Sequence, residues 1–170
     1  MMEVLAIFDT KDYEDTRTVS EKYSVRGIIM RGDKLAMQCS SEGEYKIPGG
    51  GQEPGETFHQ TLMREIREET GLLVCVDSIR ELGEILEVRR DIFDENAKYI
   101  CHSMFYFCRV EDRQVEMELT ASERAKGYYL KWATPEEIYH RNILIEKDPW
   151  IIRDTAFIKM LADKKIKLPN

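Results

Sequence analysis

The sequence predicts an α/β domain with a mixed β-sheet and helices on its faces. Short apolar runs typical of strands occur at 23–30 and 35–39, separated by a turn sequence of Arg, Gly and Asp. Segments with helical spacing lie among such runs, most clearly 58–70, where apolar residues recur at every fourth position. This mixture of strand and helix signals favours layers packed around one core.

The remaining elements are predicted in chain order by the same signals. Further strands are expected at 4–8, 45–47, 72–76, 83–88, 99–110 and 128–132. Regular structure is expected to stop at the proline and three glycines of 48–51, and Gly71 stands at the C-terminal cap of the helix 58–70. Thr134 and Asp148, each followed by proline, predict two helix starts, the second helix running through Leu161.

The length of 170 residues fits a single domain, 1–170, and a hydrophobic share of 42% is enough for one core. No repeat, low-complexity tract or flexible linker marks a boundary. Residues 1–22 are expected to form an N-terminal extension that can supply an edge strand, and 148–165 to form a C-terminal helix.

The charge balance excludes some partners. Thirty-two acidic residues against 25 basic ones give a net charge of −7, which argues against binding a nucleic-acid polymer. No apolar run approaches the roughly 20 residues of a membrane span, and the N-terminus lacks a signal peptide, so a cytoplasmic protein is expected. The four cysteines form no C-x-x-C pair, which favours reduced thiols over a zinc site or disulfides.

Three glutamates on the helix 58–70 carry the first chemical signal. Glu65, Glu68 and Glu69 are spaced i, i+3, i+4 and spread over about 100° of one face, beside the apolar stripe. Two carboxylates about 4 Å apart repel by about 4 kcal/mol at an effective dielectric near 20, and a divalent cation would relieve this. Hard oxygen ligands favour Mg²⁺ or Mn²⁺ over zinc. A solvated, salt-bridged helix would show the same spacing, so the helix alone does not decide.

The glycine-rich loop before the helix favours a cation-binding site over a solvated helix. The segment 50–72 resembles the Nudix box, G-x5-E-x7-R-E-U-x-E-E-x-G-U, in which U is aliphatic. The matching residues are Gly50, Glu56, Arg64, Glu65, Ile66, Glu68, Glu69, Gly71 and Leu72. The flanking P-G-G-x-x-E-x-G-E pattern is also intact. The chain therefore resembles the Nudix (MutT-like) hydrolase family.

The resemblance implies an α/β/α sandwich around a mixed sheet, covering roughly 23–161, with the box as a loop–helix–loop. It implies a pyrophosphohydrolase that cleaves a diphosphate linkage in a nucleotide-like small molecule, using water activated by one to three Mg²⁺ (or Mn²⁺) ions. The metal ligands it suggests are Gly49, Glu56, Glu65, Glu68, Glu69 and, from a later loop, Glu123 with Glu116 and Glu118 behind it.

Two of the roles in this set have alternatives: the catalytic base and the role of Glu56. Glu65 and Glu68 are both candidates for the catalytic base, and Glu56 either contacts the metal as an outer ligand or orients Arg64. Arg64, the third catalytic residue, is expected to hold the glutamates in place. Ordinary surface acids are the alternative to Glu123 as a ligand.

Residues outside the box are assigned to the substrate. Gly50 and Gly51 are expected to contact it, and Arg89 and Arg90, which with Lys98 bracket a loop, to grip a phosphate; a solvated charge run is the alternative. Trp132 and the aromatic residues of 99–107 either stack on a base or pack in the core.

The substrate is the least determined feature. A nucleoside triphosphate is the default. Glu87 and 88–90 occupy places where ADP-ribose and dinucleoside polyphosphate enzymes tend to carry proline and tyrosine, which weakens those two assignments without proving another. The alternatives are an RNA 5′-end pyrophosphohydrolase and a catalytically silent, nucleotide-sensing domain. A homodimer is left open.

Overall fold

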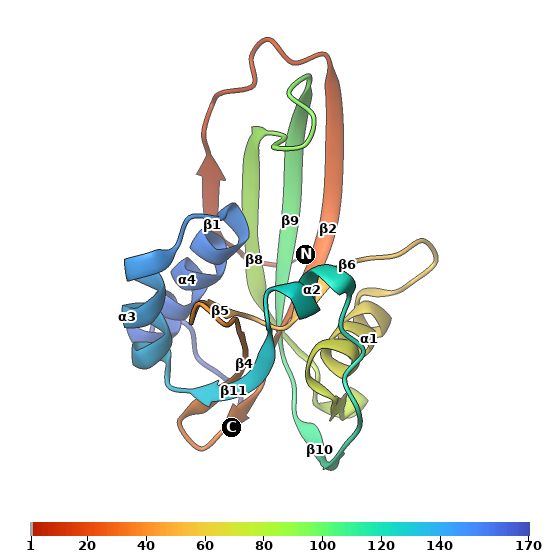
Figure 1. Ribbon diagram of the computed structural model, residues 1–170, viewed down its shortest axis with the longest axis vertical. Helices are drawn as coiled ribbons and strands as arrows, with labels where there is room; N and C mark the ends of the chain where they lie inside the picture. Colours follow the sequence, from red (N-terminus) through yellow and green to blue (C-terminus); the bar gives the residue numbers. More distant parts are fainter. Residues whose placement is uncertain (1) are drawn as a thin grey trace.

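The computed structural model describes residues 2–170 and places a mixed sheet between two helical layers (Figure 1). The strands are β1 (Val4–Asp9), β2 (Thr18–Ile28), β3 (Met30–Arg31), β4 (Lys34–Cys39), β5 (Tyr45–Lys46), β6 (Gly49–Gly51), β7 (Leu72–Val74), β8 (Arg80–Arg90), β9 (Ala97–Phe107), β10 (Val110–Gln114) and β11 (Tyr129–Ala133). The helices are α1 (Phe58–Thr70), α2 (Ala121–Ala125), α3 (Pro135–Ile145) and α4 (Pro149–Ala162), with a 3₁₀ turn at Val76–Ser78. The predicted fold class, an α/β/α sandwich, is confirmed.

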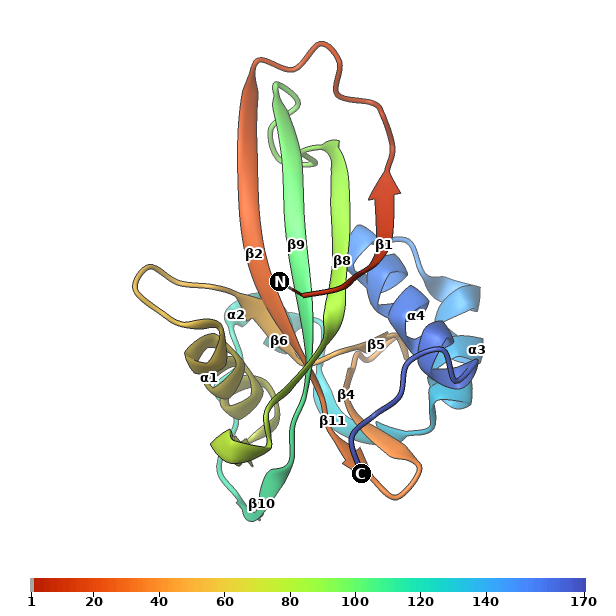
Figure 2. The same cartoon turned by 180° about the vertical axis from the view of Figure 1, so that it is seen from behind.

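The largest sheet has the strand order β1-β8-β9-β2-β6. Parallel pairs join β1 to β8 and β2 to β9, whereas β8–β9 and β2–β6 are antiparallel. A second sheet, β11-β4-β3, also pairs β4 with β5, and β10 pairs with β7. Figure 2 shows that β2, β8 and β9 extend well beyond the helices, with β1 along their edge.

The alternation of side chains along β9 builds both cores. Phe105 points to one face and stacks on Phe157 of α4, with ring centroids 4.0 Å apart. Its neighbours Met104 and Tyr106 point to the other face and pack with Leu62 of α1. Because both faces are apolar here, this half of the sheet must be covered on both sides.

Helix α1 begins and ends at specific caps. The Thr57 hydroxyl accepts a hydrogen bond from the Gln60 backbone (3.1 Å), and the Gln60 side chain accepts one from the Thr57 backbone (2.8 Å). Gly71 ends the helix at φ 74°, as predicted. These caps fix which residues of the helix face the sheet.

Three local predictions were wrong. The glycines at 49–51 form strand β6 instead of ending regular structure, because they pair with β2 from Ser24 to Arg26. The run 99–110 divides into β9 and β10, and the run 72–76 ends as a strand at Val74. Within residues 2–170, no helix is long and apolar enough to span a membrane.

Candidate active site

Glycines bring the loop before α1 into contact with the core and with the acids of the helix. Gly49 has φ 148°, and a Cβ there would lie 2.0 Å from the Val25 carbonyl oxygen. A Cβ at Gly50 would lie 2.4 Å from the carboxylate of Glu65. Only residues without a side chain allow both approaches, so the glycines set the position of Glu65 against the loop.

The Arg64 side chain contacts three glutamates of the site. Its Nε lies 2.5 Å from Glu56 Oε1, and its Nη1 lies 2.7 Å from Glu65 Oε1 and 3.5 Å from Glu68 Oε2. The guanidinium lowers the pKa of Glu56 to about 2, so this carboxylate is ionised at neutral pH. Glu56 also accepts hydrogen bonds from Thr61 and from the Glu53 backbone. Of its two predicted roles, this geometry supports the orientation of Arg64.

Glu69 is the most buried acid of the site, with a side chain 3% exposed. Its oxygens are held by Lys46 Nζ (3.2 Å) and by the Gly49 backbone N–H (2.8 Å). Burial raises the pKa of Glu69 to about 7, against the opposing effect of Lys46. Burial and the charge of Glu65 also raise the pKa of Glu68. Two neighbouring carboxyl groups are thus held in surroundings that disfavour their charge.

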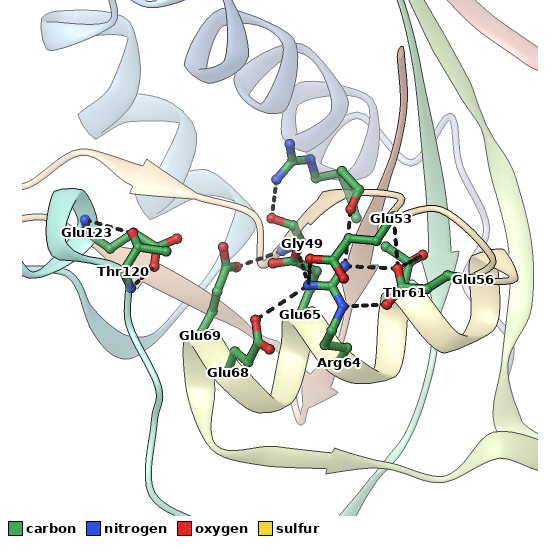
Figure 3. Close-up of polar contacts among 12 residues, drawn as sticks. Gly49, Glu53, Glu56, Thr61, Arg64, Glu65, Glu68, Glu69, Thr120 and Glu123 are labelled. Carbon is green, nitrogen blue, oxygen red and sulfur yellow. Dashed lines mark hydrogen bonds and ion pairs between the residues drawn. The ribbon is translucent and has the colours of Figure 1, made fainter.

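These acids line a cavity of about 310 Å³. Figure 3 shows Glu69, Glu68 and Glu65 in succession along α1, with Glu123 on the separate short helix α2 beside Glu69. Glu123 lines the same cavity, and its side chain also accepts a hydrogen bond from the Thr120 backbone (2.8 Å). The structure therefore brings Glu123 to the other acids, as the sequence predicted, while Glu56 lies outside the cavity lining.

The donor set of this cavity suits a hard divalent cation. Among residues 2–170, no three acidic, histidine or cysteine side chains already converge on one point, and Arg64 and Lys46 pair with the carboxylates instead. Burial raises the pKa values of Glu68 and Glu69, and the charge of Glu65 adds to both shifts, so a cation bound here would stabilise the charged forms of both groups. Mg²⁺ prefers oxygen ligands. Here α1 and α2 both supply carboxylate oxygens to the cavity.

A larger cavity of about 680 Å³ adjoins the carboxylate cavity. Arg26 and Lys46 line both cavities. The cationic side chains of the larger cavity are Lys22, Arg26, Lys46, Arg89 and Arg153. Its aromatic side chains are Tyr23, Phe93, Tyr99 and Trp150. The volume and this mixture of rings and cations are typical of a site for a phosphorylated organic molecule.

The structure places three of the four predicted substrate residues at the cavities and the fourth elsewhere. Gly51 and Arg89 line the larger cavity, and Gly50 lines the carboxylate cavity. Arg90 lines neither: its side chain bonds to Asp15 and to the Glu95 carbonyl, so it holds the N-terminal extension to the β8–β9 turn.

The aromatic candidates also differ: Phe105, Tyr106 and Phe107 are buried, 7% exposed or less. Tyr99 lines the larger cavity, whereas Trp132 packs against the core beside α1 with the Arg31 guanidinium over its ring. Sequence reasoning missed Arg26, Arg153 and Trp150. Trp150 follows the predicted helix start at Asp148 and could have been noticed there, but nothing local marks the two buried arginines.

Comparison with known proteins identifies this architecture. The family model of the NUDIX domain matches residues 21–154, most of the chain. The chain belongs to the NUDIX family. Nudix relatives include the nucleoside triphosphatase NudI of Escherichia coli (strain K12), 28% identical over 103 residues, 59% of this chain and 69% of that protein. A MutT-like protein of Streptomyces ambofaciens is 27% identical over 139 residues, 81% of this chain and 79% of the relative.

Solved structures show the same Nudix fold. A NUDIX hydrolase from Nitrosomonas europaea superimposes with a TM-score of 0.60 at 18% identity, covering 84% of this chain and 90% of that chain. A UDP-X diphosphatase superimposes with a TM-score of 0.54 at 15% identity, covering 89% and 68%. The protein is thus a MutT-like Nudix hydrolase, of the class that acts on pyrophosphate bonds.

Proposed function

We propose that this Nudix hydrolase is a Mg²⁺-dependent pyrophosphohydrolase acting on a nucleotide-like small molecule, with a nucleoside triphosphate as the first candidate. The observation that carries the proposal is the junction of the two cavities. Glutamates from α1 and α2 line the first, and cations and aromatic rings line the second. Such a junction can hold a diphosphate at the acids and the organic part beside it. A cytoplasmic location belongs to the same proposal, and a homodimer stays a prediction.

The similarity to NudI supports the choice of a nucleoside triphosphate, because that relative is named a nucleoside triphosphatase. The cavity supports it independently. Its volume of about 680 Å³ lies within the range of roughly 300–1,000 Å³ that small-molecule sites occupy. Rings such as Tyr99 and Trp150 can stack on a base, and the neighbouring cations can neutralise phosphate charge.

In this proposal Glu65, Glu68, Glu69 and Glu123 hold Mg²⁺, with one to three ions between them. Bound Mg²⁺ would supply charge neutralisation at the diphosphate and lower the pKa of water. Arg64 keeps Glu65 in position through the 2.7 Å contact. Lys46 balances the charge of Glu69 where the two cavities meet.

Glu68 fits the role of catalytic base better than Glu65. Glu65 is fixed between Arg64 and Gly50, whereas Glu68 is 31% exposed and touches Arg64 only at 3.5 Å. Burial and the nearby Glu65 raise the pKa of Glu68, which makes it a stronger proton acceptor than an ordinary glutamate. A freer carboxylate can also turn toward a bound water.

Replacement of this base tests the proposal. Glu68→Gln should lower kcat about 100- to 10,000-fold, because the amide can neither accept the proton nor bind Mg²⁺ as a carboxylate does. The measurement is phosphate or pyrophosphate release from a panel of nucleoside triphosphates and nucleoside diphosphate derivatives, with and without Mg²⁺. Glu136→Gln, an exposed change in the first turn of α3, is the control and should leave the rate unchanged. Turnover without divalent ions, or an undiminished Glu68→Gln, would refute the mechanism.

A further inference from the structure

Two buried arginines line the larger cavity, and they differ in how completely they are paired. Arg153 is 3% exposed, and its guanidinium contacts Asp154, Ser103 and Glu87. Arg26 is 6% exposed, and no carboxylate lies within ion-pair distance of it among residues 2–170. The first arginine is paired with acids of the protein, whereas the second is a buried cation whose nearest acids, Asp154 and Glu69, act on it only from beyond ion-pair distance.

The guanidinium of Arg26 also has N–H donors without hydrogen-bond partners. Its Nη1 donates to the Gly49 carbonyl oxygen (2.7 Å), and its buried Nε has no partner. Burial and the charge of Arg153 both lower the pKa of Arg26. A guanidinium carries five N–H donors, and a buried donor without a hydrogen-bond partner costs free energy of folding. The protein has therefore kept an arginine where its own groups do not satisfy it.

The position of Arg26 indicates what would satisfy it. Of the residues that the structure describes, 2–170, only Arg26 and Lys46 are shared between the linings of the carboxylate cavity and the larger cavity. The ammonium of Lys46 is already paired with Glu69 at 3.2 Å. Arg26 is thus the cation with free donors at the junction, where an anionic group joining the two cavities would pass.

We propose that Arg26 binds the phosphate that stays attached to the organic part of the substrate, at the boundary between the two cavities. This inference rests on the proposed function and makes it more specific, because it assigns one phosphate of the diphosphate to one side chain. The planar fork of the guanidinium matches two oxygens of a phosphate group. A monophosphate product would keep this contact after the rest of the phosphate chain has left, which for a nucleoside triphosphate is pyrophosphate.

The contact can be measured without metal and without turnover. We would titrate the protein in EDTA, by calorimetry at constant ionic strength, with the four common ribonucleosides and with their 5′-monophosphates. The readout is the ratio of the two Kd values for one base, which isolates the contribution of the phosphate. The wild-type protein should bind the best monophosphate about 10- to 100-fold more tightly than its nucleoside.

Two variants and one control make the assignment specific. Arg26→Gln should reduce this ratio to about 1 while leaving nucleoside affinity unchanged, which also shows that the cavity is folded. Arg26→Lys keeps a positive charge and should retain part of the ratio, so it carries the test if the glutamine variant unfolds. Arg31→Gln, on β3 beside Trp132, should match the wild type.

Each outcome has a defined meaning. An unchanged ratio in Arg26→Gln, or in Arg26→Lys if the glutamine variant unfolds, would overturn the role of Arg26 and leave the pyrophosphohydrolase proposal intact. Equal affinity of the wild type for nucleosides and monophosphates would also overturn it. If the wild type bound neither ligand while hydrolysing another diphosphate, both this inference and the nucleotide substrate would fall, but the metal-dependent reaction would stand.

Discussion

The guanidinium of Arg64 explains how neighbouring carboxylates can be arranged in one site before any cation binds. It contacts Glu56, Glu65 and Glu68 at distances between 2.5 and 3.5 Å. Glu69 is compensated separately by Lys46. Because Arg64 contacts the first three acids and Lys46 the fourth, the four carboxyl groups are not equivalent: Arg64 lowers the pKa of Glu56 to about 2, whereas burial raises the pKa of Glu69 to about 7. This difference gives the site a pH dependence.

Mg²⁺ affinity should depend on pH through Glu69. Burial raises its pKa to about 7, so at pH 6 the carboxyl is mostly protonated, and binding of the cation must release that proton. Affinity should therefore rise with pH and level off above 7, by about tenfold between pH 6 and pH 8. Calorimetric Kd values for Mg²⁺ at these pH values measure this.

The Glu69→Gln variant provides the comparison. It should bind Mg²⁺ more weakly and should lose most of the change between pH 6 and pH 8, because the titrating group is gone. Equal wild-type affinity at the two pH values would show that Glu69 does not bind the ion as a carboxylate.

The residues that the sequence could predict are those that one continuous segment contains. Glu65, Glu68 and Glu69 share one helix face because of their spacing, and the helix formed as expected. Arg26 and Arg153 come from β2 and α4 and meet only through tertiary packing. A local pattern cannot show that two arginines far apart in the chain will be buried at one cavity.

At the scale of the element, backbone pairing overrode local preference at the glycine-rich loop. Three glycines in succession predict a break in regular structure, yet Gly49–Gly51 form β6. Antiparallel pairing with β2 and the hydrogen bond from the Gly49 N–H to Glu69 hold this segment extended. The absence of side chains, which predicted a break, is what lets the strand lie so close to Val25 and Glu65.

The short helix α2 gives Glu123 two functions that can be separated. Its carboxylate closes the capping box with Thr120 and also lines the carboxylate cavity. Glutamine can perform the first function, as Gln60 does in α1, but it cannot supply a charged ligand. Glu123→Gln should leave the melting temperature nearly unchanged and weaken Mg²⁺ binding about tenfold or more.

A neighbouring acid serves as the control for this prediction. Glu118 is exposed and pairs with Arg67 at 3.0 Å, and it does not line the cavity. Glu118→Gln should bind Mg²⁺ like the wild type. If the two variants bound Mg²⁺ equally well, Glu123 would be only a helix cap, the alternative that the sequence left open.

At the scale of the whole molecule, the extended strands determine where the larger cavity lies. β2, β8 and β9 run past the helical layers (Figure 1). Residues of these three strands line the larger cavity together with Trp150 and Arg153 of α4. The edge strand β1 pairs in parallel with β8, from Val4 opposite Glu84 to Asp9 opposite Val88. Pairing across about 80 residues of chain leaves no local signature, so the sequence could suggest an edge strand without specifying its neighbour.

Coupling between the site and global stability gives the last prediction. Mg²⁺ that binds only the folded state should stabilise it by about 1.4 kcal/mol at 10 mM if Kd is about 1 mM. For a domain of this size, that corresponds to a rise in Tm of about 3–6 °C. The net charge of −7 means that any salt could stabilise the protein by screening, so NaCl of equal ionic strength is the necessary reference. Differential scanning calorimetry measures the difference.

A triple variant separates site binding from screening. Glu65→Gln, Glu68→Gln and Glu69→Gln together remove the carboxylates of α1 while keeping the approximate side-chain volumes. This variant should show no Mg²⁺-specific rise in Tm, although NaCl should affect it nearly as it affects the wild type. If Mg²⁺ raised the Tm of both proteins equally, the stabilising ions would bind elsewhere, and the crowding of acids on α1 would have no thermodynamic link to a cation.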